Sequence, residues 1–157
     1  MEIVRYEEEY KEQIIDHILN IQNNEYFLDL TIEEESDLLD IENEYFISGG
    51  YFWVAIENNK VIGTIALQKK TTDGAVLKKF FVNREYRNRK IGLMLYQLLI
   101  DYCKTINIHT LVLDTPSVTH TAHNFYRKAG FKEIPIEDLP FKFDYPDRDS
   151  IMFIKKI

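Results

Sequence analysis

The sequence predicts an α/β fold in which strand-like and helix-like segments alternate along a chain of 157 residues. Two observations predict it. Residues 75–82 form an apolar run rich in β-branched and aromatic side chains, which is typical of a buried strand. Over residues 91–105, apolar side chains recur at the three- and four-residue spacing of a helix. We expect residues 1–157 to form a single domain, since domains commonly hold about 100 to 200 residues.

The N-terminal third is expected to hold one short strand and two helices. The strand covers residues 3–6. A helix over residues 8–21 follows, because several isoleucine and leucine side chains share one face: Ile14, Ile15, Ile18 and Leu19. A second helix is expected to begin at residue 31 or 32 and to continue through Tyr45. Gly49 and Gly50 then end the helical part.

A β-hairpin is expected next. Residues 52–57 and 60–68 read as strands, and Asn58 and Asn59 between them form the two-residue turn that hairpins prefer. A turn over residues 71–74 leads into the strand at 75–82. The first half of the sheet is therefore expected to be antiparallel.

The C-terminal part is expected to alternate again between strands and a helix. Residues 110–114 read as a buried strand, residues 120–129 as a helix that Gly130 closes in a left-handed conformation, and residues 131–134 as a strand. Residues 135–150 hold three prolines and many charges, which predicts a long loop before a last strand at 151–155.

A basic turn, residues 87–92, separates the strand at 75–82 from the helix that follows. Between Lys78 and Lys90 there are six cations and one anion, in a protein of net charge −7. The first amides of a helix lack partners within it and attract anions. The turn therefore predicts a specific site for an anion such as a pyrophosphate, whereas nucleic-acid binding usually shows as an overall basic domain. The alternative is a solvated helix entrance.

The basic turn resembles the acyl-CoA-binding motif of the GNAT superfamily of N-acetyltransferases, Gln/Arg-x-x-Gly-x-Gly/Ala. Arg87 matches its first position and Gly92 its last, while Lys90 stands at the first Gly. Thirty residues further along, the family's Ala-x-x-Phe-Tyr-x-x-x-Gly-Phe signature is reproduced without a gap by Ala122, Phe125, Tyr126, Gly130 and Phe131. Thr119 replaces an Asn that many members carry before this Ala.

This resemblance implies a GNAT-like central mixed, mostly antiparallel sheet flanked by helices and splayed between its fourth and fifth strands. It implies an enzyme that moves an acetyl group from acetyl-CoA directly to a primary amine of a small molecule or peptide, within a ternary complex and without a metal. Two other interpretations stay open. One is a non-catalytic acyl-CoA-binding or protein-interaction module on the same fold, and the other is binding of a different nucleotide such as ATP.

The resemblance also assigns roles to individual residues. The backbone of Phe80, Phe81 and Val82 would meet the pantetheine and the thioester, and Tyr126 would protonate the departing sulfur. Thr119 would contact the cofactor. The pyrophosphate would be held by six consecutive residues: Arg87, Asn88, Arg89, Lys90, Ile91 and Gly92. A phenol with a usual pKa near 10 is protonated at neutral pH, as such an acid must be.

The general base is left open, because the strand at 75–82 contains no carboxylate. Asp114 ends a neighbouring strand, and His120 and His123 lie near Tyr126 in the sequence. Each also has a structural interpretation, as a turn or surface residue. A base that acts through a water molecule is equally compatible with the sequence.

The acceptor is expected to be cationic. Residues 1–47 carry fifteen carboxylates and two cations, a net charge of −13, which would attract a polyamine or a lysine side chain. The alternative is that these charges only solvate helix faces.

The sequence shows neither a secretory signal nor a run of about 20 apolar residues, so a cytoplasmic protein without a membrane partner is expected. Cys103 is the one cysteine and reads as a reduced structural thiol. By analogy with other proteins of this fold, a homodimer is possible.

Overall fold

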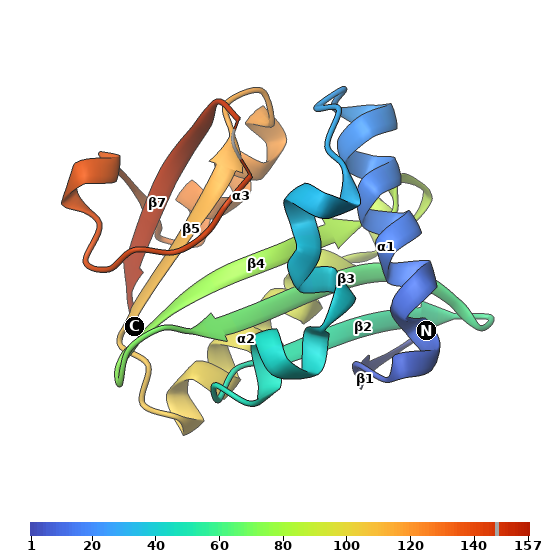
Figure 1. Cartoon of the computed structure of the whole chain (residues 1–157), viewed down its shortest axis with the longest axis horizontal. Helices are drawn as coiled ribbons and strands as arrows, with labels where there is room; N and C mark the ends of the chain where they lie inside the picture. Colours follow the sequence, from blue (N-terminus) through green and yellow to red (C-terminus); the bar gives the residue numbers. More distant parts are fainter. Residues whose placement is uncertain (147) are drawn as a thin grey trace.

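A computed structural model describes residues 1–146 and 148–157. Its described strands form one sheet in the order β1-β2-β3-β4-β5-β7-β6, and every neighbouring pair is antiparallel except β4 and β5 (Figure 1). The strands are β1 (Glu2–Arg5), β2 (Tyr51–Glu57), β3 (Lys60–Lys69), β4 (Gly74–Val82), β5 (Thr110–Pro116), β6 (Lys132–Ile134) and β7 (Ser150–Lys156). The expected mixed, mostly antiparallel sheet is confirmed.

The sheet opens between its fourth and fifth strands. β4 and β5 pair only where Gly74–Val76 meets Thr110–Val112, and the two strands then diverge (Figure 1). Residues 77–82 of β4 are therefore left with one neighbouring strand, β3, within the described sheet. The expected splay is confirmed, and it exposes backbone groups along the second half of β4.

Helices cover both faces of the sheet (Figure 1). On one face lie α2 (Ile91–Thr105) and α3 (His120–Lys128), and on the other lie α1 (Lys11–Asn20), η3 (Ile32–Leu39) and η4 (Glu42–Phe46). β2 shows why both faces are covered: Trp53 and Ala55 pack toward α2, while Phe52 and Val54 pack toward α1. Short helical turns complete the chain: η1 (Glu8–Tyr10), η2 (Ile21–Glu25), η5 (Arg84–Arg89) and η6 (Ile136–Asp138).

Several local predictions are confirmed. The helix expected over residues 91–105 is α2. Asn58 and Asn59 both have positive φ, 52° and 62°, as a tight hairpin turn between twisted strands requires. Gly130 has φ 96° directly after α3, in the left-handed region that glycine enters without strain.

The prediction of one continuous second helix through Tyr45 is wrong. The helical path breaks at Asp40, whose φ of −145° and ψ of 62° separate η3 from η4. The Asp40 carboxylate accepts a hydrogen bond of 2.6 Å from Nδ2 of Asn43, a local bond that competes with helix continuation. A second departure occurs at Glu35, where φ is −127° and ψ 44°. Its side chain is buried, being 2% exposed.

A β-bulge interrupts β4 at Lys79. Ala66 pairs with Lys78 and Thr64 with Phe81, so that Lys79 and Phe80 together oppose one residue of β3. Lys79 has φ 55°, and its carbonyl accepts a hydrogen bond of 2.7 Å from the Thr64 hydroxyl. The bulge lets consecutive residues of β4 face different parts of the molecule, and the sequence pattern gives no sign of it.

His17 ties α1 to β4 and is expected to make stability depend on pH. It is 9% exposed, its Nε2 lies 3.4 Å from the Phe81 carbonyl, and burial lowers its pKa to about 4. Since an unfolded His has a pKa near 6.5, the unfolded state takes up the proton first as pH falls. The free energy of unfolding should therefore drop by up to about 3 kcal/mol between pH 6.5 and 4 because of this residue.

The measurement is urea unfolding across that pH range. His17→Gln should flatten the pH dependence, whereas the matched variant His109→Gln, at an exposed position, should not. An equal slope in all three proteins would contradict the assignment.

Candidate functional site

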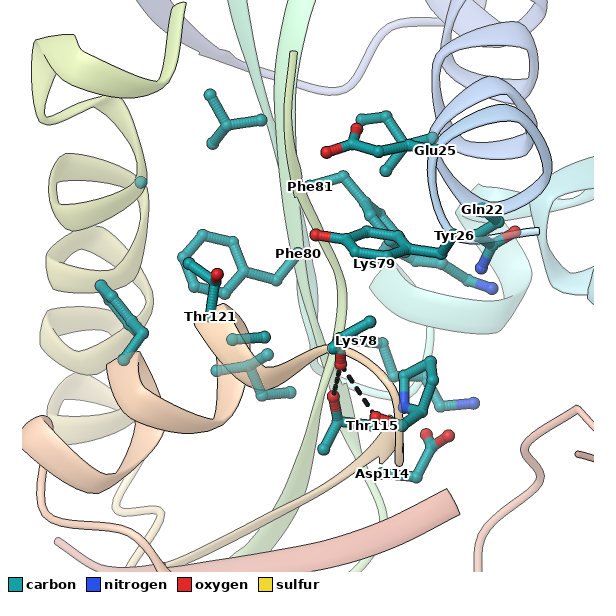
Figure 2. A pocket seen from close by; sticks show the side chains of 18 of the residues that line it. Gln22, Glu25, Tyr26, Lys78, Lys79, Phe80, Phe81, Asp114, Thr115 and Thr121 are labelled. Atoms are coloured by element: carbon teal, nitrogen blue, oxygen red, sulfur yellow. Dashed lines mark hydrogen bonds between the residues drawn. The ribbon is translucent and has the colours of Figure 1, made fainter. Parts of the chain in front are cut away.

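A cavity of about 780 Å³ lies where β4 and β5 diverge (Figure 2). Its walls are the second half of β4, the end of β5 at Asp114–Pro116, Tyr126 of α3, the first turn of α2, and the η2 and η3 segments on the opposite face. The cavity therefore connects the two layers of helices through the opening in the sheet.

Nine of the residues predicted to form the site line this cavity: Phe80, Phe81, Val82, Arg87, Lys90, Gly92, Asp114, Thr119 and Tyr126. Four others are not among its lining residues: Asn88, Arg89, Ile91 and His120. Arg89 forms an ion pair of 3.0 Å with Glu57, and Ile91 is a core residue that is 1% exposed. The functional role of each of these residues stays a prediction.

The first turn of α2 begins at a residue in a left-handed conformation and has no side-chain cap among the described residues. Lys90, immediately before it, has φ 60° and ψ 20°, a left-handed conformation that a side chain opposes by about 1 to 2 kcal/mol. This strain explains why the motif usually has Gly here. No side chain among the described residues caps the turn, so its first amides point outward without a helical partner. A methyl group on Gly92 would lie 3.6 to 3.7 Å from Phe80 and Val82, an ordinary contact distance.

Arg87 lies at the edge of the cavity and is held by two elements. Its Nε donates to the Val82 carbonyl at 2.9 Å, and its Nη2 donates to Oε2 of Glu25 at 2.7 Å. Nη1 contacts the other oxygen of Glu25, so the pair is bidentate. The hydrogen bond with Glu25 raises the pKa of the Arg87 guanidinium above its ordinary value. The cation expected to meet the pyrophosphate is thus paired with the η2 segment, which lines the cavity from the opposite face of the sheet.

Tyr126 faces the cavity from α3 in an aromatic setting. The residue is 6% exposed, and its ring lies 5.7 Å from that of Phe131, 5.9 Å from Phe153 and 6.4 Å from Phe80, measured between centroids. Burial raises the pKa of the Tyr126 phenol well above its ordinary value. The hydroxyl is therefore a proton donor throughout the physiological range.

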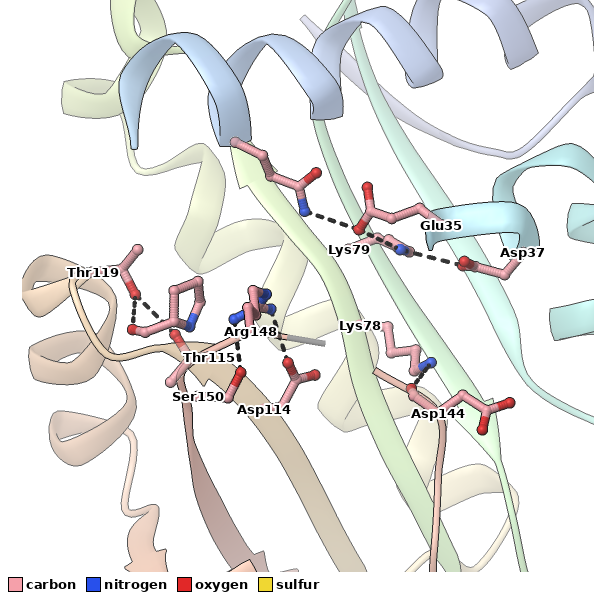
Figure 3. Close-up of polar contacts among 12 residues, drawn as sticks. Glu35, Asp37, Lys78, Lys79, Asp114, Thr115, Thr119, Asp144, Arg148 and Ser150 are labelled. Atoms are coloured by element: carbon pink, nitrogen blue, oxygen red, sulfur yellow. Dashed lines mark hydrogen bonds and ion pairs between the residues drawn. The ribbon is translucent and has the colours of Figure 1, made fainter. Parts of the chain in front are cut away.

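Asp114 is the carboxylate that β5 brings to the cavity. Arg148 donates to it at 2.8 Å through Nη2 and to the Ser150 hydroxyl at 2.9 Å through Nη1 (Figure 3). Burial raises the pKa of Asp114, and the positive charges of Arg148 and Lys78 oppose that rise. A buried carboxylate of raised pKa has the properties of a general base.

The other candidates near Tyr126 have structural partners or face solvent. His120 is exposed at the start of α3. His123 is buried, and its Nε2 lies 2.9 Å from the Pro116 carbonyl. The Thr119 hydroxyl donates to the same carbonyl at 2.9 Å and lies 2.9 Å from the Thr115 hydroxyl, as Figure 3 shows.

The acidic N-terminal region contributes little charge to the cavity. Of the fifteen carboxylates in residues 1–47, only Glu25 and Glu35 line it. Among the described residues, six cations line the cavity and only four carboxylates do, so positive charge predominates here while negative charge predominates over residues 1–47. Glu35 belongs to a buried polar network, with Gln22, Lys79 and Asp37, that was not anticipated from the sequence (Figure 3).

The described residues include no group of three or more His, Cys, Asp or Glu side chains placed to hold a metal ion. None of the described helices combines the length and apolar character that crossing a bilayer requires. Cys103 is buried in α2, and burial raises the pKa of its thiol to about 12.

Solved structures share this architecture along the full chain. An acetyltransferase of the GNAT family from Staphylococcus aureus MU50 is 39% identical with a TM-score of 0.95, covering 99% of this chain and 98% of that one. An acetyltransferase from Streptococcus agalactiae 2603 is 38% identical, with the same TM-score and coverage. An N-acetyltransferase, PaiA, from Thermoplasma acidophilum, solved in complex with coenzyme A, has the same fold at 22% identity and a TM-score of 0.75, over 99% of this chain and 98% of that one.

Curated relatives are longer proteins. A probable N-acetyltransferase camello from Xenopus tropicalis is 37% identical over 107 residues, which are 66% of this chain and 49% of that protein. An N-acetylaspartate synthetase from Danio rerio is 32% identical over 101 residues, 63% of this chain and 36% of that protein. The chain thus spans half or less of the length of these relatives. The model of the acetyltransferase (GNAT) family matches residues 15–131, and the chain belongs to this family.

Proposed function

We propose that this protein transfers an acetyl group from acetyl-CoA to the primary amine of a small molecule or peptide. One observation carries the proposal. A single cavity, at the point where the sheet opens, is bordered by the uncapped first turn of α2, by unpaired backbone of β4 and by the Tyr126 phenol. The helix start would bind the pyrophosphate of acetyl-CoA, the β4 backbone would bind its pantetheine and thioester, and the phenol would protonate its sulfur.

The residues present fit acetyl-CoA. Arg84, Arg87 and Lys90 line the cavity beside the first turn of α2, where amides and helix dipole favour phosphate oxygens. Residues 77–82 of β4 have backbone N–H and C=O groups that do not pair with β5. The pantetheine amides would form hydrogen bonds with these groups, much as a strand does when it adds to the edge of a sheet. A GNAT-fold relative solved with coenzyme A supports the same choice of cosubstrate.

The proposed reaction needs an acid for the leaving sulfur, a base for the amine and donors for the carbonyl oxygen. Acetyl-CoA supplies an activated acetyl group. The neutral amine nitrogen bonds to its carbonyl carbon while backbone N–H groups of β4 stabilise charge on the carbonyl oxygen. The carbon–sulfur bond breaks, and Tyr126 donates its proton to the sulfur. The amine nitrogen loses one N–H proton as the amide forms, and among the candidate bases for that proton we favour Asp114, because it lines the cavity and burial raises its pKa.

The test is incubation of the protein with acetyl-CoA and a panel of amines: propylamine, putrescine, free amino acids and a lysine-containing peptide. We expect thiol release that depends on the amine, with an N-acetylated product seen by mass spectrometry. Binding of acetyl-CoA without any acetylated amine would favour the non-catalytic module. Equal competition by ATP would favour a site for another nucleotide.

A further inference from the structure

Glu35 is a buried carboxylate with only half of its hydrogen-bonding capacity used. Its Oε1 accepts two bonds of 2.9 Å, one from the Gln22 amide and one from the Lys79 ammonium. Its Oε2 is buried and has no hydrogen-bond partner among the described residues. An unsatisfied buried acceptor is unfavourable by about 1 to 3 kcal/mol, and more when it is charged. Because Glu35 is also a lining residue of the cavity, a rotation of its side chain would bring this oxygen to a ligand that could satisfy it.

Gln22 presents a second unsatisfied acceptor beside the first. The Gln22 Nε2 donates to Glu35, so the Gln22 Oε1 cannot face the same carboxylate oxygen. This Oε1 is also buried and has no hydrogen-bond partner among the described residues. Gln22 is 3% exposed, and it lines the cavity together with Glu35 (Figure 2). These two unsatisfied acceptors belong to residues that hydrogen-bond to each other, and they would suit a group that brings several N–H bonds and a positive charge.

Neighbouring charged and polar side chains hold the Glu35 carboxylate in place. Lys79, which the β-bulge in β4 turns toward η3, forms ion pairs with Glu35 at 2.9 Å and with Asp37 at 3.4 Å (Figure 3). The Tyr45 hydroxyl donates to the same Asp37 at 2.5 Å. Glu35 and Asp37 share the Lys79 ammonium, so this one ammonium does not balance both carboxylates. The break in η3 at Glu35 is what turns this carboxylate inward.

We propose that Glu35 and Gln22 form a subsite that binds a primary ammonium group of the acceptor, with Lys79 and Asp37 as the residues that position Glu35. This proposal rests on the proposed function, since it names the chemical class that the acceptor half of the cavity selects. The ammonium is either the amine to be acetylated or a second one on the same acceptor. A monoamine and a diamine distinguish these cases.

The experiment compares the wild-type protein with Glu35→Gln and with Glu33→Gln, which removes the same charge from an exposed position of η3. Propylamine and putrescine are titrated calorimetrically into the protein with and without CoA. Loss of a charge-assisted hydrogen bond should weaken their binding to Glu35→Gln by about tenfold or more. Glu33→Gln should bind them as the wild type does. A loss confined to putrescine would assign the subsite to a second ammonium.

Gln22→Met provides an independent variant, since it keeps the side-chain size and removes the amide oxygen. It should also weaken amine binding severalfold. Acetyl-CoA affinity is measured on every variant and should stay close to wild type. Glu35→Gln leaves Lys79 with Asp37 as its remaining ionic partner, so its melting temperature should fall, and circular dichroism checks that each variant is folded at the titration temperature. Amine binding that is unchanged in Glu35→Gln would overturn the proposal, as would absence of binding to the wild type at millimolar amine. Failure of acetyl-CoA to bind would instead refute the proposed function, because the titrations without CoA test the subsite separately.

Discussion

Replacing Tyr126 with Phe is expected to lower kcat for acetyl transfer by about 100-fold or more, because a positioned general acid contributes about 10² to 10⁴ in rate. Acetyl-CoA should bind as before. The substitution removes one oxygen and keeps the ring, which packs against Phe80, Phe131 and Phe153. The loss should therefore appear in kcat and leave the KM for acetyl-CoA unchanged.

Tyr96→Phe is the matched control for this experiment. Tyr96 is also 6% exposed and belongs to the same aromatic cluster, but it lies on α2 outside the cavity lining. Steady-state kinetics with saturating amine should show wild-type turnover for Tyr96→Phe. If both variants turn over at the wild-type rate, Tyr126 is a packing residue and the sulfur takes its proton from elsewhere.

Gly92→Glu should weaken acetyl-CoA binding by about 100-fold or more. The new carboxylate would stand in the first turn of α2, where the phosphates are expected, and close like charges at a protein surface repel by up to about 4 kcal/mol. The variant should still fold, since the helix dipole favours a carboxylate at this end. Calorimetric titration with acetyl-CoA measures the effect.

Gly92→Ala tests whether the size of a side chain at this position matters independently of its charge. Its methyl group would meet Phe80 and Val82 at 3.6 to 3.7 Å, so it needs no rearrangement. We expect its affinity for acetyl-CoA to lie within about threefold of wild type, an energy difference below about 1 kcal/mol. Similar weakening in both variants would show that any side chain blocks the turn, and wild-type binding by both would move the pyrophosphate away from α2.

The features that could be predicted from the sequence are local ones. The helix at 91–105, the asparagine turn of the hairpin and the left-handed Gly130 each follow from a few adjacent residues, and the structure confirms them. The family could also be predicted, because both motifs are short local patterns. One lies at the start of α2 and the other in α3, and residues of both line the cavity.

The features that escaped prediction depend on contacts between distant residues. Glu35 stood within a segment that read as one helix, and its burial depends on Lys79, 44 residues away. Lys79 in turn reaches it because of a bulge that has no signature in the strand pattern. Asp114 was noted as a possible base, but its partner Arg148 lies in a loop 34 residues further along. Local periodicity holds no information about such pairings.

Under the proposed function, the ion pair of Arg87 with Glu25 would link the binding of the cofactor to the binding of the acceptor. Arg87 has one guanidinium, and a phosphate that engages it competes with Glu25. Glu25 ends η2, the same turn that carries Gln22. Freeing this turn would alter the acceptor half, and by reciprocity an acceptor would alter cofactor affinity by the same factor. The apparent dissociation constant of each substrate would then depend on the concentration of the other.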